Sequence, residues 1–136
     1  MTAVQGHFFY RSVGVDQLGD DDLRAILHVA RGRNADAGLT GCLHFEDGMF
    51  FQWLEGPQSM LEQVILSIRA DQRHHSLTVL SEGFQDARRF GDWSMRFSER
   101  HQGSLLDWLA NSDAVTVKSR TYAEAIARFL HSLQPQ

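Results

Sequence analysis

Two apolar runs joined by a short polar turn constrain the fold of this chain more than any other feature. The sequence Glu46-Asp47-Gly48 separates an apolar run at 39–45 from a second one at 49–55. Aspartate followed by glycine between two such runs is a strong signal for a tight hairpin turn. The sequence therefore predicts two antiparallel strands, over 39–45 and 49–55, joined at this turn.

One polar side chain interrupts the second strand of this hairpin. Gln52 is the only strongly polar residue in the run 49–54, which otherwise has the composition of a buried strand. Leaving a buried amide without partners costs about 1–3 kcal/mol, so the donor and the acceptor of Gln52 each need one. Alternation puts Phe51 and Trp53 on the face opposite to Gln52. The pattern leaves open which face the helices cover, and whether the partners are protein or ligand.

Five more segments before residue 98 show the periodicity of strands or helices. The acidic run 20–22 suits a helix start, because carboxylates favour the positive end of the helix dipole. Asn34 lies four residues beyond Ala30 on the apolar stripe of this helix, so its side chain should face the core. In chain order, the predicted segments are a strand at 7–12, a helix from 20 to about 34, a helix that Pro57 opens in its first turn and that ends near 70, and strands at 77–80 and 93–97.

The order of these elements predicts an α+β fold. Strand, helix, strand, strand, helix, strand matches the ferredoxin-like βαββαβ pattern, and a fifth strand follows it. Both helices should then cover one face of one sheet. On the fifth strand, two-residue alternation places Trp93, Met95 and Phe97 on one face.

The C-terminal segment is expected to cover the other face of the sheet, whose apolar surface is too large to leave exposed. A short helix is predicted at 105–109, and a clearly amphipathic one at 122–133. Thr121 and Glu124 have the spacing of a capping box at the start of the second helix. These patterns divide the chain into a domain at 1–98 and a helical extension at 99–136 that packs on the sheet.

Composition excludes several classes of partner. The chain has 136 residues and a formal net charge of -4, and no Lys/Arg cluster offers the basic footprint that nucleic acids require. No apolar stretch approaches the ~20 residues that span a bilayer, and the N-terminal residues do not have the pattern of a signal peptide. Cys42 is the single cysteine, which excludes an intramolecular disulfide. We therefore expect a cytoplasmic protein of one core that binds neither nucleic acid nor membrane.

The residues that common enzyme classes need do not occur at workable spacing. There is no phosphate-cradling glycine loop and no nucleophile elbow. Seven histidines invite a metal site, but His74 and His75 are adjacent and diverge, and the others lack a helical two-histidine spacing. We therefore expect neither a metal nor an enzyme activity.

Three polar residues should converge on this fold: Tyr10 on the first strand, Asn34 on the first helix and Gln52 on the hairpin. Around them, the sequence resembles the BLUF family of blue-light sensors, which hold a flavin between the two helices of a ferredoxin-like sheet. The matching segments are Phe9-Tyr10-Arg11-Ser12, Arg33-Asn34-Ala35 with Gly38-Leu39-Thr40-Gly41, Phe51-Gln52-Trp53-Leu54-Glu55-Gly56, Arg73-His74, and Arg88-Arg89-Phe90 with Asp92-Trp93-Ser94-Met95.

The resemblance implies a light-driven switch. Tyr10 would give an electron and then a proton to the photoexcited flavin, and Gln52 would stand between Tyr10 and the ring edge. Because the Gln52 amide has a donor at one end and an acceptor at the other, rotation or tautomerisation changes what it offers to each neighbour. The family differs over whether the residue at Trp93 or the one at Met95 approaches the glutamine, so both are candidates.

The resemblance also implies a set of residues that bind FAD. Asn34 would hydrogen bond to the flavin ring, Ile26 and Ile68 would lie against its two faces, and Arg73 and His74 would contact the ribityl and phosphate end. Phe50 completes the expected set, with Tyr10 and Gln52. Two positions depart from the pattern of some members, since Ala30 stands where they carry serine and Ser67 where they carry arginine.

The expected function is that of a blue-light photoreceptor without turnover. The change at Gln52 would pass through the fifth strand to a signalling protein in trans, or to another copy of this chain in a homo-oligomer. Two alternatives remain at this point: a small hydrolase on a ferredoxin-like sheet, and a protein-interaction module that has lost the flavin. The first lacks the glycines of an anion-cradling loop, and the colour of the purified protein tests the second.

Overall fold

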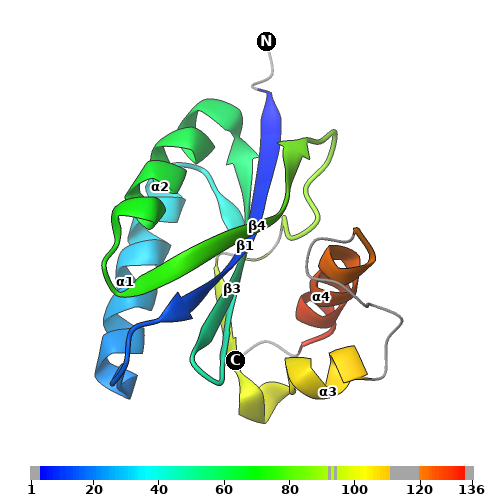
Figure 1. Cartoon of the computed structure of the whole chain (residues 1–136). Helices are drawn as coiled ribbons and strands as arrows, with labels where there is room; N and C mark the ends of the chain where they lie inside the picture. Colours follow the sequence, from blue (N-terminus) through cyan, green and yellow to red (C-terminus); the bar gives the residue numbers. More distant parts are fainter. Residues whose placement is uncertain (1–3, 92, 94, 111–119, 134–136) are drawn as a thin grey trace.

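The computed structural model describes residues 4–91, 93, 95–110 and 120–133 (Figure 1). Its strands form one sheet in the order β4-β1-β3-β2-β5, in which β2 and β5 are parallel and the other neighbours antiparallel. The strands are β1 (Gln5–Gly14), β2 (Thr40–Glu46), β3 (Met49–Pro57), β4 (His74–Phe84) and β5 (Arg96–Glu99).

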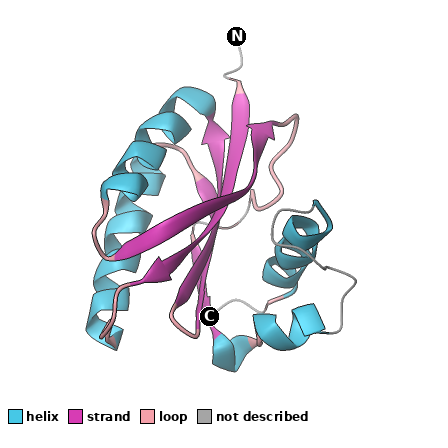
Figure 2. Ribbon diagram, viewed as in Figure 1, coloured by secondary structure: helices cyan, strands magenta, loops and turns pink. Residues whose placement is uncertain are grey.

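Helices cover both faces of this sheet (Figure 2). α1 (Asp20–Asp36) and α2 (Gln58–Ala70) lie on one face, while α3 (Leu105–Ala110) and α4 (Arg120–Ser132) lie on the other side (Figure 1). A 3-10 turn, η1 (Arg100–Gln102), connects β5 to the segment before α3. The predicted α+β fold is confirmed: a ferredoxin-like βαββαβ core, a fifth strand and a C-terminal helical pair.

The hairpin turn has the geometry that its sequence predicts. Asp47 and Gly48 both have positive φ, 50° and 79°, and they join the paired residues Glu46 and Met49. Two consecutive positive φ angles define a type I′ turn, whose twist matches that of the flanking strands. This turn fixes the register of β2 with β3.

Strand alternation separates two cores, one on each face of the sheet. The single core expected from composition is therefore wrong, because apolar side chains alternate to both faces of the strands. On the helix side, the apolar cluster includes Phe8, Tyr10 and Phe50 from the strands. On the tail side, Phe51 and Trp53 pack with residues of α4, an arrangement that buries the apolar face of that helix. Gln52 therefore faces α1 and α2, which settles the choice that the sequence pattern leaves open.

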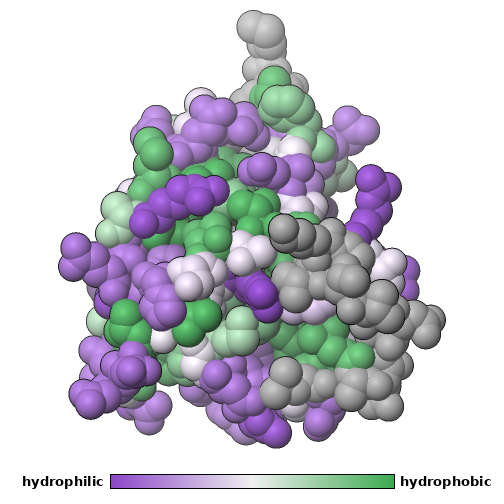
Figure 3. Space-filling view, viewed as in Figure 1, coloured by the Kyte–Doolittle hydropathy of each residue, from purple (hydrophilic) through white to green (hydrophobic). Residues whose placement is uncertain are grey.

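The outer surface is mostly polar where Figure 3 views it, with smaller apolar areas between hydrophilic side chains. Among the described residues, the exposed large apolar side chains are spread over several parts of the fold: Val4 before β1, Val29 on α1, Leu66 on α2, Val79 and Phe84 on β4, and Trp108 on α3.

The start of the fifth strand differs from the prediction. β5 begins at Arg96, and Met95 just before it has a φ of 53°, so the alternation of an extended strand does not reach back to Trp93. Met95 and Phe97 pack against the helix-side core, whereas Trp93 packs against the tail-side core. The expectation that Trp93, Met95 and Phe97 share one face is therefore wrong.

Two predicted helix starts also move. Pro57 is the last residue of β3 and the N-cap of α2, one position before the first helical turn. Thr121 lies inside α4, which begins at Arg120, so it is not the N-cap of a capping box. Glu124 binds Arg89 of the segment before β5 instead, at 2.9 Å. Tertiary contacts thus use the glutamate that the local pattern assigned to capping.

Candidate functional site

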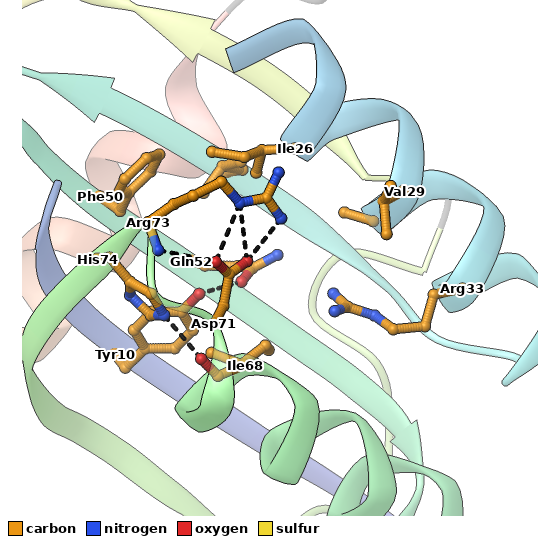
Figure 4. A pocket seen from close by; sticks show the side chains of 12 residues that line it. Tyr10, Ile26, Val29, Arg33, Phe50, Gln52, Ile68, Asp71, Arg73 and His74 are labelled. Atoms are coloured by element: carbon orange, nitrogen blue, oxygen red, sulfur yellow. Dashed lines mark hydrogen bonds and ion pairs between the residues drawn. The ribbon is translucent and has the colours of Figure 1, made fainter. Parts of the chain in front are cut away.

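A pocket opens between α1 and α2 above the central strands β1 and β3 (Figure 4). Its lining combines apolar side chains with a few polar ones. The lining residues are Tyr10, Ile26, Val29, Ala30, Arg33, Leu43, Phe50, Gln52, Ile68, Asp71, Arg73 and His74. Apolar pockets with a few placed polar groups are typical of cofactor sites.

Tyr10 and Gln52 meet on the floor of this pocket. They are cross-strand partners in the register of β1 with β3, and both are buried. Tyr10 Oη donates a hydrogen bond to Gln52 Oε1. Burial raises the pKa of the Tyr10 phenol, while the nearby Arg33 guanidinium opposes that rise. The phenol therefore carries its proton and points it at the amide oxygen.

The other end of the Gln52 amide also has a partner. Gln52 Nε2 donates to Met95 Sδ at 3.4 Å, and Met95 is 1% exposed. Thioether sulfur is a weak acceptor, so this bond is weaker than the one from Tyr10. The amide thus lies between a good donor and a weak acceptor.

Asn34 carries a buried donor that no described residue satisfies. The residue is 1% exposed, its Oδ1 accepts from Arg33 Nε at 3.3 Å, and its Nδ2 has no partner among the described residues. Asn34 is not among the lining residues. It lies on α1 one helical turn after Ala30, which lines the pocket. A buried amide N–H without a partner is costly, which fits a ligand that accepts from it.

Charged and polar groups gather at one end of the pocket. Arg73 binds Asp71 at 2.6 Å, and this contact lowers the pKa of Asp71. His74 is held on both ring nitrogens, by Ser12 Oγ at 2.7 Å and by the carbonyl of Ile68 at 2.7 Å. The end with Arg73 and His74 suits an anionic or strongly polar part of a ligand. Arg33 lies apart from them, beside Val29 in Figure 4; burial lowers the pKa of its guanidinium, which stays cationic at neutral pH.

The side walls of the pocket are apolar. Ile26 comes from α1 and Ile68 from α2, and they lie on opposite sides of the view in Figure 4. Phe50 adds an aromatic ring from β3, edge-on to the ring of His74 at a centroid distance of 6.3 Å. A flat heteroaromatic ring between two branched aliphatic side chains would bury most of its faces.

The structure brings most of the expected site residues together, and leaves one apart. Tyr10, Ile26, Phe50, Gln52, Ile68, Arg73 and His74 line the pocket, Asn34 lies one turn from it, and Met95 contacts Gln52. Trp93 packs instead on the tail side, with its ring stacked on His131 at 5.6 Å.

Several lining residues were not expected from the sequence. Val29 and Arg33 follow Ile26 by three and seven residues, so helical periodicity alone would have placed them on the same face. Leu43 comes from β2 and Asp71 from the end of α2, positions that only the tertiary arrangement brings to the pocket. Within the described residues, no group of three His, Cys, Asp or Glu side chains is placed to hold a metal ion. None of the described helices combines the length and apolarity that crossing a membrane requires.

Comparisons with known proteins agree with this arrangement. The sequence model for sensors of blue-light using FAD matches residues 6–96. Photoactivated adenylate cyclase subunit beta of Euglena gracilis is 32% identical over 98 residues, 72% of this chain and 11% of that protein. The blue light- and temperature-regulated antirepressor BluF of Escherichia coli (strain K12) is 34% identical over 86 residues, 63% of this chain and 21% of that protein. The chain thus spans only about a tenth to a fifth of these relatives.

Solved structures match over much larger shares. The ground state of BlsA has a TM-score of 0.83 and 28% identity, and the match covers 97% of this chain and 91% of BlsA. The dark-state structure of BlrB, described as a BLUF protein, has a TM-score of 0.75 and 28% identity, with 96% and 100% of the two chains covered. These two matches extend over the C-terminal helices as well as the sheet.

Proposed function

Because this chain belongs to the BLUF family of blue-light sensors, we propose that the pair Tyr10 and Gln52 is its light-driven switch. The observation that carries the proposal is the hydrogen bond from Tyr10 Oη to Gln52 Oε1 on the floor of the pocket. In this proposal the chain acts as a sensor without turnover of its own, and its match to BlsA and BlrB over nearly the whole of their chains supports this.

The residues of the pocket fit a flavin. Asn34 Nδ2 would donate to a carbonyl oxygen of the ring, and this contact would satisfy the buried donor. Ile26 and Ile68 would lie against the two ring faces, with Phe50 near one edge. A bound flavin supplies the absorption of blue light and an acceptor for one electron.

The proposed role of Tyr10 follows from its chemistry and its position. A phenol can give up an electron and then a proton, and the Tyr10 proton already points at Gln52 Oε1. The electron would pass to the bound flavin. Gln52 Oε1 would accept the proton while Nε2 gives up one of its own toward the flavin, so that the side chain changes tautomer and can rotate. After rotation, Nε2 would face Tyr10 and Oε1 would face Met95 Sδ, which offers no donor. The two amide orientations would therefore differ by about 1–3 kcal/mol.

We further propose that the cofactor is FAD. The family description names FAD, whereas one solved relative, BlrP1 of Klebsiella pneumoniae, is described with FMN and cyclic diGMP. Arg73 and His74 stand at the polar end of the pocket, where they would face the ribityl chain and the first phosphate. Both flavins share these groups, so mass spectrometry of the extracted chromophore decides between them.

The signal is proposed to leave through β5 to a partner in trans or to a second copy of this chain. Ser98 on β5 binds His44 Nδ1 at 2.8 Å, and His44 Nε2 lies 3.0 Å from Glu46 Oε1. Glu46 in turn accepts from the backbone N–H of Leu105, the first residue of α3, at 2.7 Å. These bonds connect the strand after Met95 to the C-terminal helices. In this proposal, residues 1–98 are the flavin-binding domain and 99–136 the extension.

Absorption spectroscopy of the purified protein tests the function. We expect a bound flavin and a reversible change of its visible spectrum after blue light. A protein that stays colourless after incubation with FAD would instead support a flavin-free interaction module. A flavin that stays bound but unchanged under blue light would contradict the proposed switch.

A further inference from the structure

A turn just before β5 decides which side chain lies beside Gln52. Met95 on the helix side accepts a hydrogen bond from Gln52 Nε2, while Trp93, two residues earlier, packs in the tail-side core. An extended strand would place these two side chains on the same face. The backbone at this turn therefore selects the neighbour of the proposed switch.

Met95 holds the turn in a conformation that its own side chain disfavours. Its φ is 53°, in the left-handed region, where a residue with a Cβ atom is strained. If Met95 returned to an extended conformation, Trp93 would compete with it for the face that Gln52 occupies. The surrounding contacts must therefore hold this backbone in place.

Main-chain bonds hold one end of the turn. The N–H of Met95 donates to the carbonyl of Trp93 at 2.9 Å, and the same carbonyl accepts from the N–H of Gly41 on β2 at 2.8 Å. The carbonyl of Met95 itself is held from the opposite side, by Arg31 on α1. Arg31 Nε donates to it at 3.3 Å. Hydrogen bonds from β2 and from α1 thus hold the carbonyl groups at the two ends of the turn.

We propose that Arg31 is a positioning residue, which holds the carbonyl of Met95 and so keeps Met95, rather than Trp93, beside Gln52. This inference deepens the proposed function and rests on it. A guanidinium stays charged at any working pH, so titration does not remove this donor. Because the bond is 3.3 Å long and Arg31 is exposed, we expect it to contribute about as much as an ordinary hydrogen bond. Arg31 does not line the pocket, so it acts through Met95 and not on a ligand.

The contacts of Trp93 on the tail side of the sheet offer a second way to observe the conformation of this turn. The Trp93 ring stacks on His131 of α4 at 5.6 Å with an interplanar angle of 5°, and the Arg96 guanidinium lies over it at 4.2 Å. A turn that relaxed would withdraw Trp93 from α4 as it withdrew Met95 from Gln52. In this proposal Arg31 therefore affects two contacts of the turn, that of Met95 with Gln52 and that of Trp93 with α4.

Nuclear magnetic resonance on the flavin-free protein tests this role without light. The signals are the methyl group of Met95 and the indole N–H of Trp93, each assigned through its own substitution. In Arg31→Ala we expect the alternative turn to gain about three- to tenfold in population, the effect of losing one ordinary hydrogen bond, with both signals shifted or split. Arg31→Gln keeps a donor and should lie between wild type and Arg31→Ala. Arg24→Ala, on the exposed start of the same helix, is the matched control and should leave both signals unchanged.

The flavin-loaded protein supplies the second arm of the experiment. Arg31→Ala should change the rate of dark recovery by a similar factor, while Arg24→Ala keeps the wild-type rate. Wild-type Met95 and Trp93 signals in Arg31→Ala overturn the inference, and if that variant does not fold, Arg31→Gln is judged by the same signals. If the wild-type protein shows no light response, the proposed function is wrong. The signals of flavin-free wild type and Arg31→Ala still decide whether Arg31 positions Met95.

Discussion

Tyr10 on β1 and Gln52 on β3 face each other in register, and the buried phenol of the first donates to the amide oxygen of the second. Main-chain hydrogen bonds between β1 and β3 hold both residues, so rigid strands and not loops set the position of Tyr10 relative to Gln52. A change in the amide therefore occurs in a fixed frame. This pair is the basis of the predictions that follow.

Replacing Gln52 with leucine removes both hydrogen-bonding ends at similar volume. We expect Gln52→Leu to keep bound flavin, because the apolar walls and Asn34 remain, and to lose the light-induced spectral change. Absorption before and after blue light measures this. Gln63→Leu, on an exposed part of α2, serves as the control and should respond like wild type. A normal spectral change in Gln52→Leu would place the switch elsewhere.

Removing the phenol hydroxyl tests the donor role of Tyr10. In Tyr10→Phe the proton that points at Gln52 Oε1 is absent, so we expect the normal reversible photocycle to disappear. Time-resolved absorption after a blue pulse reports it. The chain has two tyrosines, and Tyr122→Phe on α4 provides a matched control with an intact cycle. An intact cycle in Tyr10→Phe would contradict the assignment.

Asn34 should matter for binding more than for folding. Its Nδ2 has no partner among the described residues, and its Oδ1 accepts only a long bond of 3.3 Å from Arg33 Nε, so Asn34→Ala is expected to leave the melting temperature of the flavin-free protein nearly unchanged. The same substitution should weaken flavin binding by about fivefold, since one buried hydrogen bond contributes roughly 1 kcal/mol. Fluorescence titration with FAD gives the affinity. An equal affinity in the variant and in wild type would mean that Asn34 does not contact the ligand.

His44 on β2 predicts that the free energy of unfolding falls in acid. Its ring lies beside Glu46, which binds the first residue of α3. Burial lowers the pKa of His44, so folding favours the neutral ring, and its contribution is fully present above the unfolded pKa of about 6.5. As pH falls below that value, the unfolded state binds the proton more readily and stability is lost. His7 also has a pKa lowered by burial and adds to the same slope.

Urea unfolding at several pH values measures this effect. We expect His44→Gln to flatten the loss of stability below pH ~6.5, because the amide keeps polar contacts and does not titrate. His7→Gln should remove a separate part of the slope. A His44→Gln protein with the full wild-type slope would show that His44 does not contribute to it.

Glu55 is a buried carboxylate that organises the segment before β5. It accepts from Trp53 Nε1 at 3.0 Å and from the backbone N–H groups of Arg89 at 2.8 Å and Phe90. Glu55→Gln places an amide N–H₂ among these donors, and we expect a loss of about 2 kcal/mol or more in the free energy of unfolding. Glu62→Gln, exposed on α2, should change it by less than about 0.5 kcal/mol. Equal stabilities of the two variants would contradict this role.

Much of the fold could be predicted because strong local signals agree with each other. Asp47-Gly48 specifies a type I′ turn, and the apolar stripes of the helices match the faces that they bury. The choice of face for Gln52 could not be made locally, since both faces of β3 meet apolar cores. Only the packing of the C-terminal helices against Phe51 and Trp53 decides it.

Parts of the site could not be predicted from the sequence where they depend on the backbone conformation of single residues. No glycine marks the positive φ at Met95, so the sequence pattern extends the fifth strand through it and puts Trp93 on the wrong face. Asp71 comes to the pocket from the end of α2, beyond the reach of any periodicity. These positions follow from contacts between elements, such as the bond from Arg31 to the Met95 carbonyl.

The central claim is that the Gln52 side chain itself changes state under blue light. Light-minus-dark infrared difference spectroscopy measures this directly, on flavin-loaded protein with isotope-labelled glutamine side chains. We expect label-sensitive amide bands in the wild-type difference spectrum and their absence in Gln52→Leu. A wild-type difference spectrum that contains flavin bands, but no band that responds to the label, would contradict the account.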